Sequence, residues 1–199
     1  MAKETWKPGT MLYPVPVVLV TSMYGKTVNV FTVSWVGTVC TDPPMVSVSI
    51  RPKRFSYDLI KKSGEFAINL PGKDIAFAVD YCGVKSGKDI DKFAKLGLHP
   101  VQASIIKAPI IKECPVAIEV KVESVKELGS HHMFLGRVVA VNVEKSLIDN
   151  KGKLRLDKAN LLCYNHGEYF SLSKSIGRFG FSVRKRKGGK NVRKVHTEK

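Results

Sequence analysis

Residues 29–62 hold the pattern that most clearly indicates chemistry: a strand, an Asp-Pro-Pro turn, a second strand and a helix that begins at Arg54, Phe55 and Ser56. The first-turn N–H groups of such a helix lack intrahelical partners, and both they and the helix dipole favour an anion. A neighbouring guanidinium adds charge-assisted donors. The pattern predicts a site for a phosphorylated cofactor; the alternative is a solvated strand-to-helix corner.

Short strands separated by turn residues must position this corner. We expect strands over 15–21, 29–38, 45–50, 66–69, 117–125, 132–143, 161–164 and 169–172. We expect helices over 55–62, 74–81 and 90–96, ended by Gly64, Gly83 and Gly97. Residues 100–109 are expected to be irregular. This arrangement predicts a mainly β fold, an antiparallel barrel with short peripheral helices.

The chain has 199 residues and a net charge of +16. Neither an internal repeat nor a linker divides it, so we predict one domain over 1–183 and a basic, disordered tail over 184–199. The tail holds eight Lys or Arg and one Glu, a net +7 that leaves +9 for the rest. No known nucleic-acid motif or interleaved aromatic residues accompany this charge, which argues against nucleic acid as the main partner. Salt-sensitive binding through the tail remains a third hypothesis.

Other functional classes are argued against by what the sequence lacks. No apolar run approaches membrane-spanning length, and the N-terminus lacks a signal-peptide core, so we expect a cytoplasmic protein without membrane attachment. Cys40, Cys82, Cys114 and Cys163 form no C-x-x-C pair, which predicts reduced thiols; a redox pair assembled in space is the alternative. His131 and His132 would face opposite sides of a strand, which argues against a metal site. Residues 83–88 have the wrong spacing for a P-loop.

Six segments, in order, resemble the flavin reductase-like family of FMN-binding split β-barrels, which includes the flavoredoxins. They cover most of residues 12–185 and read NVFTVSWVGTVCTDPPMVSVSI, RFSYDLIKKSGEFAINLP, SGKDIDKFAKLGL, APIIKECPVAIE, LGSHHMFLGRVVAV and YFSLSKSIGRFGFSVRK. The resemblance implies an antiparallel Greek-key split β-barrel and a homodimer with FMN at the subunit interface. It also implies an oxidoreductase that passes electrons from NAD(P)H, a transient co-substrate, through FMN to free flavin, ferric iron or a partner protein. The alternative is a flavoredoxin-like carrier with a protein donor and no NAD(P)H activity.

The resemblance also assigns cofactor-binding residues. Those expected beside the isoalloxazine are Asn29, Ser34 and Trp35, and those at the ribityl-phosphate end are Ser49, Arg51, Arg54 and Ser56. Lys92, His131 and Tyr164 match family positions near the cofactor. Two alternatives stay open at this point: Trp35 as an ordinary core tryptophan, and Lys92 as an exposed helix lysine.

Overall fold

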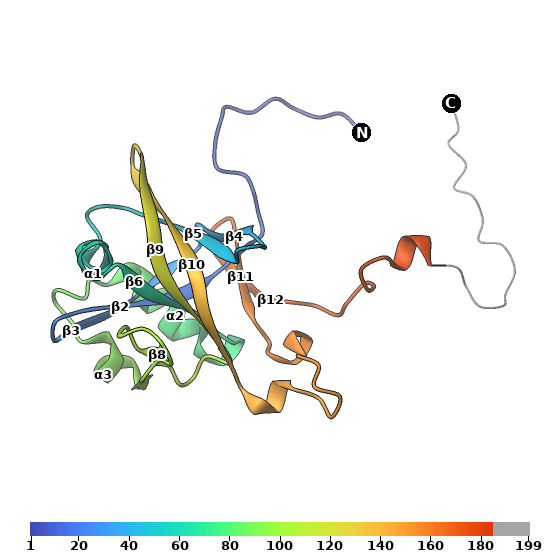
Figure 1. Cartoon of the computed structure of the whole chain (residues 1–199). Helices are drawn as coiled ribbons and strands as arrows, with labels where there is room; N and C mark the ends of the chain where they lie inside the picture. The colour runs from blue at the N-terminus through green and yellow to red at the C-terminus, as the bar shows by residue number, and fades with distance from the viewer. Residues whose placement is uncertain (185–199) are drawn as a thin grey trace, which may run out of the picture.

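The structure, a computed structural model, describes residues 1–184, so the predicted basic tail lies outside the described residues except for Arg184. Seven strands form an antiparallel sheet in the order β3-β2-β6-β9-β10-β5-β4 (Figure 1). Their bounds are Val18–Tyr24 (β2), Thr27–Val33 (β3), Val36–Cys40 (β4), Met45–Ile50 (β5), Glu65–Leu70 (β6), Val116–Leu128 (β9) and His131–Val143 (β10).

Smaller elements surround this sheet. A second sheet joins Val15–Pro16 (β1), Leu162–Asn165 (β11) and Glu168–Ser171 (β12), and a third pairs Pro100–Val101 (β7) with Ile110–Ile111 (β8). The α-helices are Phe55–Ser63 (α1), Ala76–Val84 (α2) and Lys92–Leu96 (α3). Single 3₁₀ turns are Lys73–Ile75 (η1), Lys145–Leu147 (η2), Leu156–Lys158 (η3) and Phe181–Val183 (η4). The mainly β split barrel with short helices, predicted from the sequence, is confirmed.

The two edge strands of the main sheet explain why it curls into a barrel. Strands β3 and β4 lie at opposite edges, yet only Ser34 and Trp35 separate them in the chain. Because a residue spans at most about 3.5 Å, the two edges must meet at this point. The predicted continuous strand over 29–38 is therefore wrong: the chain bends at Ser34 and Trp35 to pass from one edge to the other.

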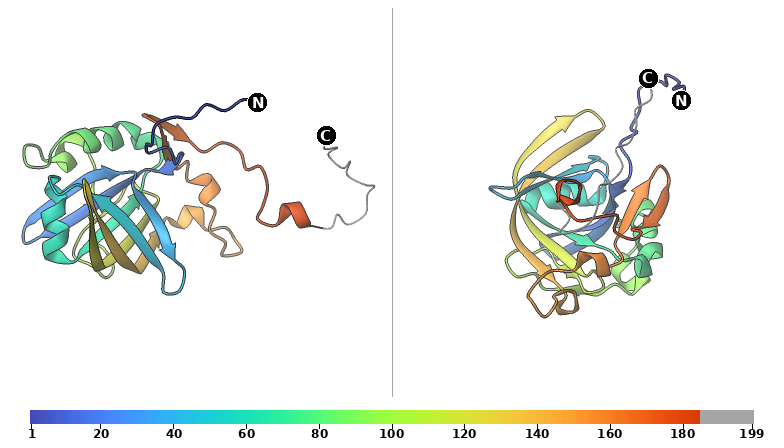
Figure 2. Two further views of the ribbon diagram at one scale, coloured as in Figure 1. Left: turned by 90° about the horizontal axis from the view of Figure 1, so that it is seen from above. Right: turned by 90° about the vertical axis from the view of Figure 1, so that its right-hand side faces the viewer.

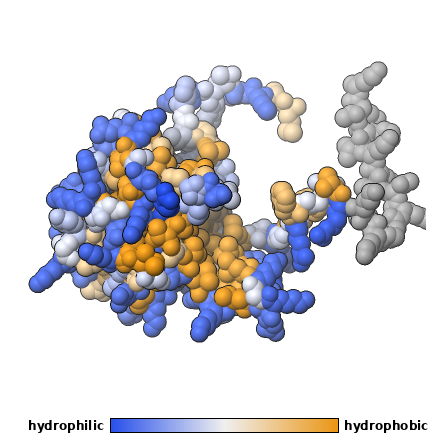
Figure 3. All heavy atoms as spheres, in the orientation of Figure 1, coloured by the Kyte–Doolittle hydropathy of each residue, from blue (hydrophilic) through white to orange (hydrophobic). Residues whose placement is uncertain are grey.

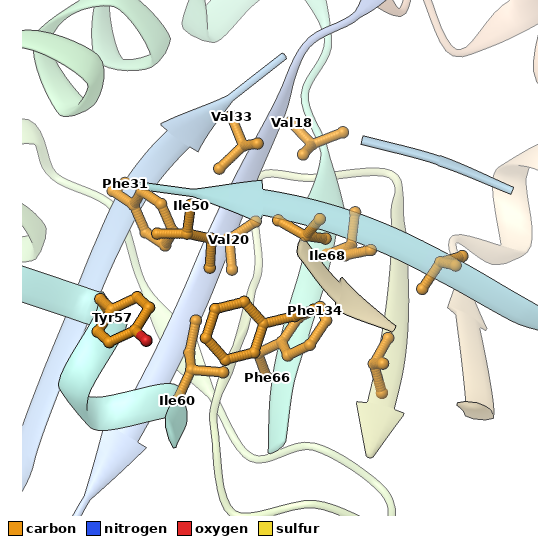
Figure 4. Close-up of a cluster of buried hydrophobic side chains, with 13 residues drawn as sticks. Val18, Val20, Phe31, Val33, Ile50, Tyr57, Ile60, Phe66, Ile68 and Phe134 are labelled. Atoms are coloured by element: carbon orange, nitrogen blue, oxygen red, sulfur yellow. The ribbon is translucent and has the colours of Figure 1, made fainter. Parts of the chain in front are cut away.

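Burial on both faces of β2 creates two apolar layers. Val18 and Val20 point into the barrel, where Phe66 and Phe134 meet α1 (Figure 4). Leu19, on the opposite face, packs beneath α2 and α3. A strand buried on both sides needs an apolar residue at every position, which explains the run Val17–Val20.

The helix ends correct one prediction. Gly64 and Gly97 adopt left-handed conformations with φ of 71° and 64°, as C-terminal stops require. Gly83, however, lies within α2, which ends at Val84. An added Cβ at Gly83 would lie 3.4 Å from the Cβ of Thr32, so a small residue there lets α2 approach β3 closely. The third helix begins at Lys92, because Asp91 caps it through the Ala94 N–H at 3.2 Å.

Two extended arms leave the barrel. The N-terminal arm, residues 1–12, and the C-terminal arm, residues 172–184, both project away from the barrel (Figures 1 and 2). Their apolar side chains are largely exposed: Leu12 is 87 % and Ile176 is 96 % exposed. Along β10, Val141 is also exposed, and apolar atoms gather over the lower half of this strand in the view of Figure 3.

Candidate functional site

Arg54 is the N-cap residue of α1, where the loop after β5 ends. Its backbone is extended, and its side chain makes no capping hydrogen bond to the helix. The guanidinium of Arg54 donates through Nη1 to the carbonyl of Gly83 at 2.9 Å, which fastens the corner to α2. A guanidinium carries five N–H donors, so this contact leaves others free to bind a ligand. The predicted strand-to-helix corner therefore exists and has a fixed arginine.

Ser56 is more buried than expected for a side chain whose only role is to bind a phosphate. It is buried, its Oγ accepts from Asn29 Nδ2 at 2.8 Å, and it also bonds the hydroxyl of Ser22 at 2.8 Å. These bonds fix α1 against β2 and β3. The hydroxyl of Ser56 thus orients Asn29 as well as lining the site.

Lys92 is not the exposed helix lysine of the alternative hypothesis. Its side chain is 3 % exposed, and its Nζ donates to the carbonyls of Val30 at 2.8 Å and Cys82 at 3.0 Å. Burial lowers its pKa; the nearby Cys82 opposes this shift and Arg54 adds to it. An ammonium has three donors, so one N–H remains for an acceptor in the hollow that Lys92 lines.

These residues meet around a space of about 290 Å³, here called the cation hollow. Its charged lining is entirely basic, with five cations and no carboxylate: Arg51, Lys53, Arg54, Lys85 and Lys92. The first residues of α1, Phe55 and Ser56, open into it. Helix N–H groups and several cations around one space form the chemistry of an anion site.

Gly87 closes one wall of the cation hollow. A Cβ there would lie 1.9 Å from Asn29 Oδ1, so only glycine lets residues 85–88 lie against Asn29. From the sequence, residues 83–88 were interpreted only as a segment with the wrong spacing for a P-loop. In the structure, Lys85 and Gly87 of this segment line the cation hollow. The residue spacing did not predict this, but a Lys-Ser-Gly-Lys run close to a phosphate site could have indicated it.

A second space of about 520 Å³, the aromatic hollow, adjoins the first and shares Phe31, Arg51, Arg54 and Val84 with it. Five aromatic side chains line it: Tyr13, Phe31, Trp35, Tyr164 and Tyr169. The ring centroid of Tyr13 lies 6.1 Å from that of Trp35 and 6.0 Å from that of Tyr164. Such a wall can pack against a flat ring system.

Polar contacts fix the rim of the aromatic hollow. His131 Nε2 accepts from Arg51 Nε at 3.4 Å, and burial, together with Arg51 and Arg54, lowers the pKa of His131. The hydroxyl of Tyr169 donates to Asp80 at 3.1 Å; burial, with this carboxylate, raises the pKa of Tyr169 to about 12. At neutral pH the rim therefore presents a neutral imidazole and a protonated phenol.

All ten predicted site residues line these two hollows. The cation hollow takes Asn29, Arg51, Arg54, Ser56 and Lys92, and the aromatic hollow takes Ser34, Trp35, Ser49, Arg51, Arg54, His131 and Tyr164. Two expected groupings change. Asn29 lies with the cations, because four residues of extended chain separate it from Ser34. Ser49 lies with Trp35, whose carbonyl accepts the Ser49 N–H at 2.9 Å. Tyr13, Tyr169, Lys53, Lys85 and Gly87 were missed.

The four cysteines are free thiols, and none lines either hollow. Burial raises the pKa of Cys82 to about 11 and raises that of Cys114 further. Within residues 1–184, no group of three or more His, Cys, Asp or Glu side chains could hold a metal ion. None of the helices in that range has the length and apolar character to span a membrane. The cytoplasmic location remains a prediction.

An antiparallel sheet that curls until its two edges meet defines the class of fold, a split β-barrel. The family model described as "Flavin reductase like domain" matches residues 10–173, and the chain belongs to this family.

Among known proteins, an uncharacterized protein of Pyrococcus abyssi is 36 % identical over 154 residues, which cover 77 % of this chain and 87 % of that protein. Flavoredoxin of Desulfovibrio vulgaris (Miyazaki F) has a TM-score of 0.86 at 30 % identity, covering 92 % of this chain and 100 % of that one. An FMN-binding protein from Thermus thermophilus has a TM-score of 0.75 at 29 % identity, covering 89 % and 98 %.

Proposed function

We propose that this chain is an FMN-binding oxidoreductase that passes electrons from NAD(P)H through FMN to a second acceptor, which is free flavin, ferric iron or a partner protein. One observation carries the proposal: the cation hollow, whose charged side chains are all basic, adjoins the aromatic hollow at Arg51 and Arg54. FMN has the matching shape, an anionic phosphate joined by a flexible chain to a flat ring. The FMN-binding relative from Thermus thermophilus supports the choice of flavin.

The residues of the chain bind and orient the cofactor. Arg54, Lys92 and the first turn of α1 would hold the phosphate, while Trp35 and Tyr164 would pack near the ring system. Bound FMN supplies the electron transfer itself. Neutral His131, which accepts from Arg51 Nε, would orient the Arg51 guanidinium so that its remaining N–H groups face the ring edge, where charge develops on reduction. Hydride transfer depends on alignment of two rings, so no acid or nucleophile is required.

A second candidate is a flavoredoxin-like electron carrier with a protein donor and no NAD(P)H activity. The likeness to a flavoredoxin over 92 % of the chain favours it. The two candidates use the same cofactor site and differ in the electron donor. Tight retention of FMN through purification favours the carrier, and easy loss favours a reductase that uses flavin as a substrate.

Two measurements test these candidates. Titration with FMN should quench flavin fluorescence at a stoichiometry of one per chain, and failure to bind at saturating FMN would sink both. NADH or NADPH should then bleach the flavin at 450 nm under anaerobic conditions (a property of the cofactor). Binding without bleaching by either nucleotide removes the reductase and leaves the carrier.

We also propose a homodimer with FMN at the interface. The exposed apolar residues of both arms support it, since an extended segment gains stability only by packing on another surface. Met11, Leu12 and Trp35 also line an apolar space of about 640 Å³ beside the aromatic hollow, so this surface reaches the site. Sedimentation equilibrium should give the mass of two chains. A monomer at micromolar concentration would contradict the dimer without affecting flavin binding.

A further inference from the structure

Helix α2 is apolar on two opposite faces. Its inward face, with Ala78, Val79 and Cys82, is buried in the apolar layer beneath β2 and β3. Its outward face carries Phe77, which is 77 % exposed, and Val84, which is 68 % exposed. A helix that is apolar on all sides is expected to be covered on all sides. Residues 1–184 leave the outward face of α2 uncovered, so a further molecule is needed to cover it.

Three side chains of the outward face form a stripe, here called the α2 stripe: Phe77, Tyr81 and Val84. They occupy positions i, i+4 and i+7, which lie on one side of a helix. The ring centroids of Phe77 and Tyr81 lie 6.2 Å apart, with an angle of 33° between the ring planes. Aromatic side chains grouped on a surface are typical of the centre of a protein–protein interface.

The α2 stripe ends at the cofactor site. Val84 lines both the cation hollow and the aromatic hollow. Two exposed lysines, Lys53 and Lys85, line the cation hollow with Val84 and are here called the basic rim. A phosphate monoester carries about two negative charges at neutral pH, which Arg54 and Lys92 can balance. The basic rim is therefore available to a second anionic surface.

The chemistry of this surface selects among possible occupants. A second copy of this chain brings like charge to the basic rim, because residues 1–183 carry a net +9. Asp80 lies between Phe77 and Val84 along α2 and accepts from the hydroxyl of Tyr169 at 3.1 Å. A nucleic acid presents a phosphate at every nucleotide and would meet this carboxylate with like charge. A folded protein can cover the apolar stripe, place acidic residues at the rim and put a neutral residue against Asp80.

We propose that the α2 stripe and the basic rim together form a docking surface for a small acidic electron-transfer protein. The redox role of this partner rests on the proposed function, because a protein docked at Val84 would lie over the mouth of the flavin site. Apolar packing on the stripe would supply affinity. Opposite charge at the basic rim would set the orientation and speed the encounter.

Biolayer interferometry of the full-length, FMN-saturated protein tests the docking surface. The probe is a plant-type [2Fe–2S] ferredoxin, which is small and acidic, and cytochrome c, a basic electron carrier, is the control for charge. Phe77→Ser removes the exposed ring and leaves the lining of both hollows intact, and Phe77→Leu keeps an apolar side chain. Val39→Ser is the matched control, because Val39 is 51 % exposed on β4 and lines neither hollow.

The ferredoxin should bind the wild-type protein, and cytochrome c should not. Phe77→Ser should weaken ferredoxin binding by about fivefold or more, as expected for an aromatic residue at the centre of an interface. Phe77→Leu should restore most of this loss, Val39→Ser should cause none, and FMN affinity should stay unchanged in all three variants. Raising NaCl from about 50 mM to about 300 mM should weaken docking severalfold, because salt screens the basic rim.

Four results would contradict part of this account. Absence of ferredoxin binding at low salt, or equal binding by the wild type and Phe77→Ser, overturns the docking surface and leaves the FMN site standing. Loss of the dimer mass in Phe77→Ser assigns the stripe to a second copy and also overturns the proposal. Binding of duplex DNA or of phosphatidylserine vesicles in place of ferredoxin, weakened by Phe77→Ser, does the same. Ferredoxin docking on a protein that binds no FMN supports the surface and refutes the flavin-based function instead.

Discussion

Replacing Lys92 with methionine should separate recognition of the flavin phosphate from the stability of the fold. The methionine keeps the length of the side chain and removes the ammonium, which lies 2.8 Å and 3.0 Å from two backbone carbonyls and has one donor left for the cation hollow. A hydrogen bond to a charged group contributes about 1.5–3 kcal/mol. Lys92→Met should therefore weaken FMN binding by about 10- to 100-fold, at about 1.4 kcal/mol per tenfold.

Riboflavin, which lacks the phosphate, provides the internal reference for this experiment. Its affinity should change less than threefold in Lys92→Met, because the aromatic hollow does not include Lys92. Lys95→Met is the matched control, since Lys95 is exposed on the same helix. Equal losses for FMN and riboflavin would mean that Lys92 only supports the wall of the hollow, and unchanged FMN affinity would refute its assignment to the phosphate.

The pH dependence provides a second test of the same residue. Burial places the pKa of Lys92 below its ordinary value of 10.5, so the ammonium is lost at a lower pH in the folded protein than in the unfolded chain. Between these two pKa values the unfolded chain binds more protons, and stability attributable to Lys92 rises with pH. FMN affinity should fall through the same window as the positive charge disappears, and Lys92→Met should lack that fall. A parallel decline in wild type and variant would contradict this account.

Three further outcomes follow from the geometry. Gly87→Ala places a Cβ 1.9 Å from Asn29 Oδ1, so it should break the bond from Asn29 to Ser56 and weaken FMN at least tenfold in a fluorescence titration. Gly37→Ala, whose Cβ would meet no atom within 4 Å and which lines neither the cation nor the aromatic hollow, is the comparison. Trp35→Leu should weaken riboflavin and FMN equally, about three- to tenfold, because it removes ring packing and no charge. The pKa of the fully buried Glu119 lies below its ordinary value, because hydrogen bonds from the N–H groups of Ser104 and its neighbours outweigh the opposing effect of burial. Glu119→Gln should lower the free energy of unfolding in urea by about 2–3 kcal/mol at pH 7. The difference from the wild type should shrink as pH falls below about 4.5.

Local chemistry made the strands, the helix ends and the phosphate corner predictable. Alternation marked β5, and Gly64 and Gly97 marked the ends of α1 and α3 because only a left-handed residue fits there. The break at Ser34 and Trp35 was not predictable, since it results from the meeting of two sheet edges that are distant in the hydrogen-bonding order. Sequence periodicity carries no information about that meeting.

The missed site residues have the same origin. Tyr13 and Tyr169 belong to segments near opposite ends of the chain, which meet because β1 pairs with β11 and β11 pairs with β12. A contact of this kind depends on strand pairing and leaves no trace in local spacing. Gly87 is comparable: the position has no room for a side chain because Asn29, 58 positions away in the sequence, lies against it.

The buried position of Lys92 shows how fold and function are joined in this site. An unpaired ammonium in an apolar layer would be expensive, so the carbonyls of Val30 and Cys82 partly replace its water. Both carbonyls belong to elements that border the cation hollow, β3 and α2. Because no carboxylate lines the hollow, the charge of Lys92 has no anionic partner there until a ligand binds. An anion entering the hollow therefore meets a cation that has already lost most of its hydration. Binding then gains strength from desolvation that occurred on folding, and for this reason the largest loss of phosphate affinity is expected at Lys92, ahead of the exposed Lys53 or Lys85.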